Sequence, residues 1–432
     1  MPRIPALVPL APWERTAQWA LFVLVLIVAW RGAWLHHAHD PYEFLRRGND
    51  SLGYYQWLPA TFIHFDWSRM YWCHQMENGN WISLFTLGVA VLQLPFFLLG
   101  HGAAYLFGYD LNGFASPYGV SMMLGGACYT AAGCVVSFRL ARRFSAPLPA
   151  LIASALLFVA TNLYFYAVRE PMMSHAYTFF LIGLYAYCSL RALDGPRGVH
   201  VLLLVLSGAL IVLVRQLNVF SLLFPLLVAG SMAQVRVFFR NLIGQRGALI
   251  GGLALGLVPW VLQMIYWHWT TGDAITFTYG KKGEGFEWDK MVPGLVVLGV
   301  RNGWLVYTPM MIAVLFMLIR KAWQGVAPAR TVLLLTCITW LLYSAWWSWH
   351  LGSGYGHRGF IDLYALLCVP LAWLIHGIMS RGPVWRMGAA IAAIALVQLN
   401  MGLIDRYDWF WSWGDWTWKR LFEQVSDVVA GK

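Results

Sequence analysis

Residues 40–80 read DPYEFLRRGNDSLGYYQWLPATFIHFDWSRMYWCHQMENGN and form one of the densest groups of ionisable and aromatic side chains in the chain. This segment follows an apolar run, Trp19 to Leu35, that is long enough to cross a bilayer as a helix. Only 11% of all residues are charged, yet this segment holds many of them. We therefore expect functional chemistry here before anywhere else.

The composition excludes a soluble globule. Hydrophobic residues make up 59% of the 432 residues, so polar side chains are too few to cover a globular surface. Apolar segments of roughly 17 to 25 residues recur along the chain, which is the length that a membrane-spanning helix needs. Their backbone must be helical because lipid offers no hydrogen-bond partners. The sequence predicts an all-α polytopic membrane protein, with residues 1–432 forming a single transmembrane domain.

Several other kinds of site are not indicated. The net charge is +11, but the arginines are dispersed among short loops rather than clustered on one basic face, so no nucleic-acid partner is expected. Of six cysteines only Cys73 lies in a polar loop, and no disulfide framework or zinc signature is visible. His36, His37 and His39 are metal-ligand residue types, but neighbours on a helix diverge, and interfacial anchoring is the favoured interpretation. No cofactor or metal site is predicted, and a requirement for a divalent metal is left open.

Charge placement predicts the topology. The first apolar run is long for a signal peptide and ends in a poor cleavage site, so we interpret it as a retained span with a cytoplasmic N-terminus. We interpret residues 82–107 as a re-entrant or interfacial helix, because a full crossing there would place Arg139, Arg142 and Arg143 outside. Cytoplasmic segments then hold fifteen basic and two acidic residues, as the positive-inside rule requires. Eleven crossings result: the first run, then about 115–138, 148–166, 171–190, 199–214, 219–234, 247–268, 303–319, 331–349, 360–379 and 387–404.

This topology brings nearly all carboxylates to the extracytoplasmic side. Three outer segments are predicted: a first loop at 36–114 with juxtamembrane or re-entrant helices, a second large loop at 269–302, and a tryptophan-rich interfacial tail at 405–432. Ionisable residues at span ends usually face a bundle interior or a water-filled cavity. We expect such a cavity on the outer face.

The order of the motifs resembles the GT-C superfamily of integral-membrane glycosyltransferases, which use sugars carried on a polyprenyl phosphate. Relatives include the aminoarabinose transferase of lipid A and the protein O-mannosyltransferases. The resemblance covers most of the chain and depends on the order and sidedness of six motifs. These are Asp50-Ser-Leu-Gly-Tyr54-Tyr55, Leu140-Ala-Arg142-Arg143, Tyr166-Ala-Val-Arg169-Glu170 with Ser174-His175, Val214-Arg215-Gln216-Leu-Asn218, Arg301-Asn302-Gly303-Trp-Leu-Val-Tyr307-Thr308-Pro309 and Gly356-His357-Arg358. The resemblance implies a GT-C type bundle.

The resemblance gives Asp50 the role of the general base that takes a proton from the acceptor hydroxyl. The residue types agree, since attack on a glycosyl phosphate needs a carboxylate near the nucleophile, and Gly48 and Gly53 suit a loop that projects into a cavity. Asp50 could equally cap the helix predicted at 51–62. Asp40 and Glu43 are the alternative bases.

Arginines near the outer face are the candidates for binding the donor phosphate, because a guanidinium binds phosphoryl oxygens in a bidentate way. The candidates are Arg358, Arg215, Arg169 and Arg301. Each has a simpler alternative: an ion pair of Arg358 with Asp362 one helical turn away, a snorkelling Arg215, a solvated hairpin at Arg169 and a solvated charge run around Arg301.

Residues expected to contact the sugar or the acceptor come from the same clusters. They are Tyr54, Tyr55, Glu170, His175, His357 and Glu284. Simple alternatives remain here too, since tyrosines gather in interfacial belts and a histidine such as His175 is often a satisfied core residue.

The resulting hypothesis is an inverting glycosyltransferase of the bacterial inner membrane, with its site on the periplasmic side. Its partners would be a polyprenyl-phosphate sugar, a glycan, lipid or protein acceptor, and membrane lipids. The alternatives are a transporter or flippase of lipid-linked sugars, and a glycan polymerase or ligase. Absence of visible internal symmetry argues against the transporter, and the early position of the prominent loop against the polymerase.

Overall fold

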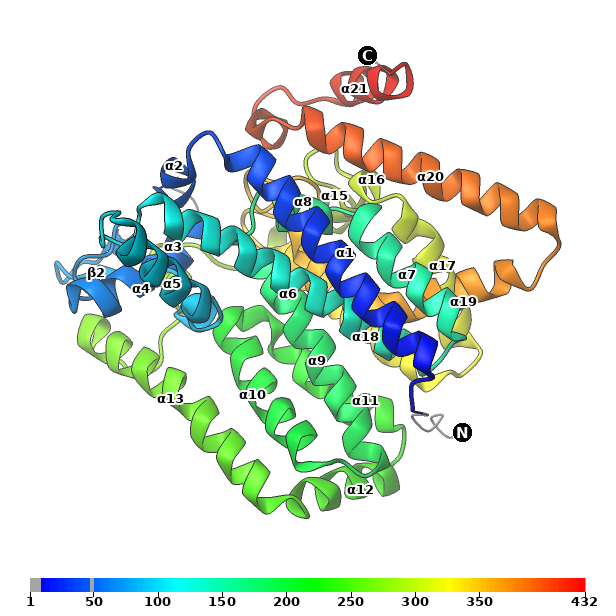
Figure 1. The fold of residues 1–432 in the computed structure, drawn as a ribbon, viewed down its shortest axis with the longest axis horizontal. Coiled ribbons are helices and arrows are strands. Elements are labelled where there is room, and N and C mark those ends of the chain that lie inside the picture. Colours follow the sequence, from blue (N-terminus) through cyan, green and yellow to red (C-terminus); the bar gives the residue numbers. More distant parts are fainter. Residues whose placement is uncertain (1–8, 47–49, 432) are drawn as a thin grey trace.

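The computed structural model describes residues 9–46 and 50–431, and within that part the side chains of Tyr42 and Glu43 are not described. The alternative base Glu43 therefore lies outside the described side chains. The described chain is a bundle of helices (Figure 1). Its longer helices are α1 (Pro12–His37), α5 (Gly88–Phe107), α6 (Ser116–Arg142), α7 (Pro147–Val159), α9 (Ser174–Asp194), α10 (Gly198–Val214), α12 (Met232–Ile243), α13 (Arg246–Thr271), α17 (Met310–Trp323), α18 (Ala327–Ala345), α19 (Tyr364–Met379), α20 (Pro383–Arg406) and α21 (Trp418–Val429).

Short elements connect these helices. They are α2 (Pro41–Arg46), α3 (Asp50–Tyr55), α4 (Trp57–Pro59), the π-helical turn η1 (Ala60–His64), α8 (Leu163–Val168), η2 (Gln216–Leu223), α11 (Phe224–Ala229), α14 (Thr278–Lys281), η3 (Trp288–Lys290), α15 (Pro293–Leu298), α16 (Trp304–Tyr307), η4 (Arg358–Leu363) and η5 (Trp409–Ser412). A hairpin pairs β1 (His74–Gln75) with β2 (Trp81–Ile82) in antiparallel fashion, with His74 opposite Ile82. The all-α prediction is thus confirmed in the described chain, apart from this hairpin.

The apolar helices make the chain a multi-pass membrane protein. In the described residues, eight helices are long and apolar enough to span a bilayer, or nine if η2, α11 and α12 together form one span broken by a 116° bend. Helices α7 and α10 are apolar but shorter. The predicted number of about eleven crossings stays a prediction. The eight include α5, which the sequence analysis interpreted as a segment that returns to its own side.

Packing separates a central layer from a lipid-facing periphery. The most apolar windows of α6 and α9 are 67% and 72% buried, whereas those of α1, α13 and α20 are only 22%, 22% and 17% buried. Figure 1 shows α13 and α20 at the rim of the bundle and α1 crossing its front face. An apolar helix that is exposed along its length is stable only against lipid.

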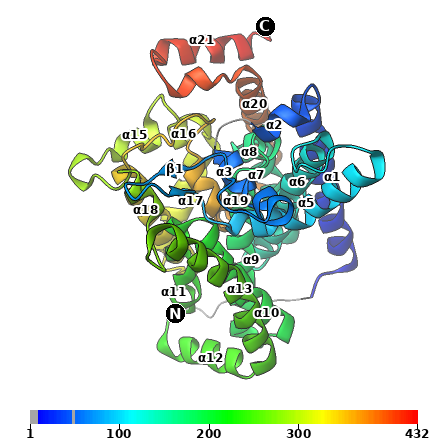
Figure 2. The same ribbon diagram turned by 90° about the vertical axis from the view of Figure 1, so that its left-hand side faces the viewer.

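Helices α1 and α6 run antiparallel and define the two ends of the bundle. At one end Gly119 of α6 packs against the carbonyl of Pro41, just after α1, and at the other Arg142 of α6 pairs with Glu14 of α1. We call the first the cavity end and the second the opposite end. The chain between α1 and α6 thus starts and finishes at the cavity end, which is compatible with a re-entrant α5. The hairpin, α3, α15 and α16 spread across the face turned toward the viewer in Figure 2.

Two close contacts place connecting segments deep inside the cavity end. Pro171, just before α9, packs against Gly126, which lies well inside α6. At Gly88, where α5 begins, a Cβ would lie 2.5 Å from the carbonyl oxygen of Leu213, so only glycine permits this approach to the end of α10. Thr86 also donates a hydrogen bond to that carbonyl. Because α9 and α10 stop short of the end of α6, room is left for a recessed site.

Candidate functional site

The recess contains a cavity of about 460 Å³. Its walls come from the connecting segments rather than from the middles of the long helices. The lining residues are Asp50, Tyr54, Trp72, Leu84, Phe85, Thr86, Val214, Arg215, Gln216, Leu217, Phe277, Tyr279, Lys282, Glu284, Tyr343, Trp346, Trp347, Ser348, Leu351, Gly352, Arg358 and Trp413. Segments far apart in sequence therefore meet here, and they bring together Asp50, Arg215, Arg358, Tyr54 and Glu284 of the predicted site.

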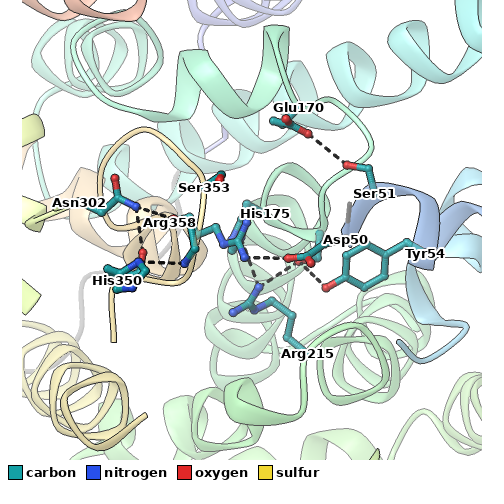
Figure 3. A network of polar contacts seen from close by, with 12 residues as sticks. Asp50, Ser51, Tyr54, Glu170, His175, Arg215, Asn302, His350, Ser353 and Arg358 are labelled. Atoms are coloured by element: carbon teal, nitrogen blue, oxygen red, sulfur yellow. Dashed lines mark hydrogen bonds and ion pairs between the residues drawn. The ribbon is translucent and has the colours of Figure 1, made fainter. Parts of the chain in front are cut away.

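The first ion pair of the cavity joins Asp50 to Arg358 (Figure 3). Asp50 is the first residue of α3 and Arg358 the first residue of η4, and Nη2 of the arginine lies 2.7 Å from Oδ2 of the carboxylate. The two side chains remain 35% and 16% exposed, respectively. The contact joins residues 308 positions apart, so it fastens the start of the first polar segment to the last part of the bundle.

The alternative interpretation of Arg358, an ion pair with Asp362, is wrong, and the helix type explains why. The sequence analysis assumed an α-helical turn, in which residues four apart share a face. The segment instead forms the 3₁₀-helix η4, with three residues per turn, so residues four apart diverge around the axis. Arg358 consequently turns to the cavity, while Asp362 is fully buried.

The second ion pair forms the floor of the cavity. Nε of Arg215 lies 3.1 Å from Oδ2 of Asp362. The same carboxylate contacts Nδ1 of His175 at 3.0 Å and accepts a hydrogen bond of 2.8 Å from the Asn218 amide. Three groups thus satisfy the buried charge, which would otherwise be costly. The interpretation of His175 as a satisfied buried histidine fits these contacts, although it also adjoins Arg215.

Hydroxyl groups fix the remaining nitrogens of Arg215. Its guanidinium donates to Ser174 Oγ at 3.1 Å and to the Tyr343 hydroxyl at 2.7 Å. Tyr54 donates in turn to Ser174 Oγ at 3.3 Å, and burial raises the pKa of Tyr54, so its phenol stays protonated. Figure 3 shows Arg215 and Arg358 approaching the same space beside Asp50. The Asp50 carboxylate and these two guanidinium groups therefore share one cavity.

A third charged pair and a set of aromatic rings form the other wall. Nζ of Lys282 lies 2.6 Å from Oε1 of Glu284. Burial raises the pKa of Tyr279 well above its ordinary value. The loop that carries these residues is held to the end of α18, because Phe286 bridges to Trp346 and the Trp347 amide donates to the Gly285 carbonyl. Aromatic rings near a polar site suit the apolar face of a sugar ring or the edge of a lipid chain.

Two of the four predicted phosphate ligands do not line the cavity. The Arg169 guanidinium donates to the carbonyls of Tyr407 and Asp405, and that of Arg301 donates to the carbonyl of Gly414 at 2.7 Å. Both arginines thus fasten the segment after α20 to the bundle. The sequence analysis did not anticipate these contacts with backbone carbonyls.

Other predicted residues lie beside the cavity rather than in its lining. Asp40 is exposed. Glu170 accepts a hydrogen bond from Ser51 at 3.2 Å and so supports α3 next to Asp50. Tyr55 is buried and donates to the carbonyl of Gly113, in a cluster with other rings. His357 is buried with Nε2 2.9 Å from the carbonyl of Trp349, and burial lowers the pKa of His357 to about 3.

Sequence reasoning missed several lining residues. Tyr343 and Tyr279 were not named as site residues, and Trp346, Trp347 and Trp413 were treated only as part of apolar or interfacial segments. A weak signal existed in the Trp346-Trp347 pair that closes an apolar run. An interfacial belt predicts the same pattern, so the sequence alone does not separate the two interpretations.

Metal-ligand side chains do not gather in the part of the chain that the structure describes: groups of three or more histidine, cysteine, aspartate or glutamate side chains that could hold an ion are absent there. His37, from the predicted histidine run, lies with Nε2 3.1 Å from the carbonyl of Arg169. The described cavity places the Asp50 carboxylate beside the guanidinium groups of Arg358 and Arg215.

Comparisons with protein-family models, with curated proteins and with solved structures return no match for this chain. The cavity and its charges are consequently the basis for any functional conclusion.

Proposed function

We propose that the cavity catalyses transfer of a sugar from a polyprenyl-phosphate donor to a hydroxyl acceptor at the extracytoplasmic face of the membrane. The observation that carries this proposal is that Asp50 shares one cavity with Arg358 and Arg215. The order of sequence motifs that resembles the GT-C superfamily supports it independently.

The reaction uses each charged group in one step. Asp50 accepts the proton of the acceptor hydroxyl, whose oxygen forms a bond to the anomeric carbon. The bond between that carbon and the phosphate oxygen breaks on the opposite face, and its electron pair stays on the phosphate. Arg358 and Arg215 stabilise the charge that develops there. Displacement from the opposite face inverts the anomeric configuration.

The aromatic wall and the Lys282–Glu284 pair suit the remaining parts of the substrates. Hydrogen-bonding groups and flat apolar faces alternate on a sugar, and the wall offers both kinds of partner. The polyprenyl chain would lie among the apolar side chains of the bundle. The protein would work in the bacterial inner membrane, with its cavity end toward the periplasm.

The test uses vesicles that contain the purified protein and a panel of radiolabelled polyprenyl-phosphate sugars, with an envelope extract as the source of acceptors. Wild type should transfer label from one donor, and Asp50→Asn should lower that rate by about 10²- to 10⁴-fold. Glu14→Gln is the matched control, because it changes a carboxylate that pairs with an arginine at the opposite end.

Label that crosses the membrane unchanged, at equal rates in wild type and Asp50→Asn, would identify a carrier and overturn the proposal. Transfer that is equal in the two proteins would leave the class standing but remove Asp50 as the base.

A further inference from the structure

The charges of the cavity cancel in pairs. Arg358 pairs with Asp50, Arg215 with Asp362 and Lys282 with Glu284. An anionic donor therefore meets a site whose positive groups already have carboxylate partners. Binding must exchange at least one of those partners for the phosphate.

The Arg215–Asp362 ion pair at the floor of the cavity is costly to separate. Asp362 is fully buried and contacts Arg215, His175 and Asn218 together. Release of this carboxylate would leave a charge inside the protein without compensation, at a large cost. Arg215 nevertheless lines the cavity, so it contributes its field without giving up its partner.

The Asp50–Arg358 pair lacks this support. Its carboxylate is about one third exposed and belongs to a short helix at the cavity wall. Water can solvate the carboxylate when it separates, so the contact costs far less to open than the floor pair. A phosphate group binds a guanidinium through two oxygens and is a stronger partner than one carboxylate oxygen.

We infer that the donor phosphate displaces Asp50 from Arg358, and that this exchange frees Asp50 to accept the proton of the acceptor. The inference rests on the proposed function and deepens it. Oδ2 of Asp50 lies 2.7 Å from Nη2 of Arg358, so the carboxylate competes with the phosphate for this arginine. Arg358 thus binds the phosphate of the donor, and Asp50 becomes available as a base only when an anion has taken its place on Arg358.

Two properties follow from this exchange. The donor binds before the acceptor is activated, so a hydroxyl that arrives first meets no free base. Asp50 also weakens donor binding while it is needed for transfer. Removal of its charge should therefore change binding and catalysis in opposite directions, which a residue with a merely structural role does not do.

The experiment measures binding of undecaprenyl phosphate, which carries the anion but no sugar, to purified protein in detergent. Asp50→Asn should bind it roughly fivefold or more tightly than wild type, because the internal competitor has lost its charge. Glu284→Gln removes another negative charge of the same cavity and should tighten binding less than twofold. Glu14→Gln should bind as wild type does.

A double variant tests whether tighter binding comes only from a change in the net charge of the cavity. In the Arg358→Gln background the Asp50→Asn substitution should no longer tighten binding, since its target is gone. Tightening that persists there, or that Glu284→Gln matches, would overturn the exchange. Thermal unfolding of every variant verifies that it is folded.

The two hypotheses fail in distinguishable ways. Wild type that does not bind undecaprenyl phosphate at all, in folded protein, would contradict the proposed function. Binding that Arg358→Gln weakens but Asp50→Asn leaves unchanged would support a phosphate site and contradict the exchange alone.

Discussion

Arginines pair with carboxylates at both ends of the bundle, but the cavity described above adjoins only the pairs at the cavity end. At the opposite end Arg142 lies 2.7 Å from Glu14 and Arg143 lies 2.9 Å from Asp194. These distances match those of the Arg358 and Arg215 pairs at the cavity end. The difference is the space in front of the arginines, because Arg358 and Arg215 line a cavity of about 460 Å³, and Arg142 and Arg143 do not line it. An ion pair by itself therefore indicates nothing about function. Whether its arginine faces a cavity is the more informative observation.

The largest expected effect is that of Asp362→Ala, a substitution at the cavity end. Asp362→Ala leaves Arg215 buried without its carboxylate, and we expect it to destabilise the protein by about 3–5 kcal/mol. Transfer per folded molecule should fall by about 10²-fold or more, since the floor cation is no longer positioned. Thermal unfolding and transfer rates, normalised to folded protein, measure both quantities.

Glu14→Ala is the matched variant at the opposite end, where both side chains of the pair are also mostly buried. It should lower stability by a comparable amount and leave transfer per folded molecule within about twofold of wild type. If it abolished transfer as Asp362→Ala does, the distinction between the two ends would be lost.

The next effect concerns arginines within the cavity end. Arg215→Ala should weaken undecaprenyl phosphate binding by about tenfold or more, because a charged partner of the phosphate is lost. Arg169→Ala and Arg301→Ala should change that binding less than about twofold, since those arginines contact the segment after α20. They should instead speed limited proteolysis within residues 405–416. A loss of binding in Arg169→Ala equal to that in Arg215→Ala would restore the sequence-based assignment.

The smallest effect depends on pH and on His357 at the edge of the site. Burial lowers the pKa of His357 to about 3, from an ordinary value of 6.5. Between these values the unfolded chain binds a proton that the folded protein does not, so stability is complete above about pH 6.5 and declines as the pH falls. The decline from this group approaches about 1.4 kcal/mol per pH unit. Unfolding temperatures from pH 7.5 to 5 should fall less steeply in His357→Gln, whose amide can still donate to Trp349. Parallel curves for the two proteins would show that His357 is not the cause.

The sequence predicted which side chains would meet better than it predicted how they pair. Asp50, Arg215 and Arg358 were assigned to one face because few charges and a basic excess restrict the topology. In the structure Asp362 pairs with Arg215, and not with Arg358. This pairing depends on the 3₁₀ geometry of η4, which hydrophobic periodicity does not encode. The contacts of Arg169 and Arg301 could not be predicted for another reason. Their partners are backbone carbonyls of a distant segment, and a carbonyl has no signature in sequence.

The number of spans was difficult to predict for a related physical reason. Hydropathy identifies apolar length, but α10 ends at Val214 and the chain then breaks into η2, α11 and α12. A helix that stops partway and a short complete crossing look alike in composition. The same interruptions make the recess, so the features that obscure the topology are those that create the site.

The contacts of residues 405–414 also bear on the synthesis of the protein. Trp413 lines the cavity, and Arg169 and Arg301 hold the segment on which it lies. Because a chain emerges from the ribosome N-terminal end first, Asp50 is made early and this last wall is made late. A nascent chain that has inserted most of its helices still carries an unfinished pocket. The cavity described here is therefore complete only when residues 405–414 have been translated and have packed against the bundle.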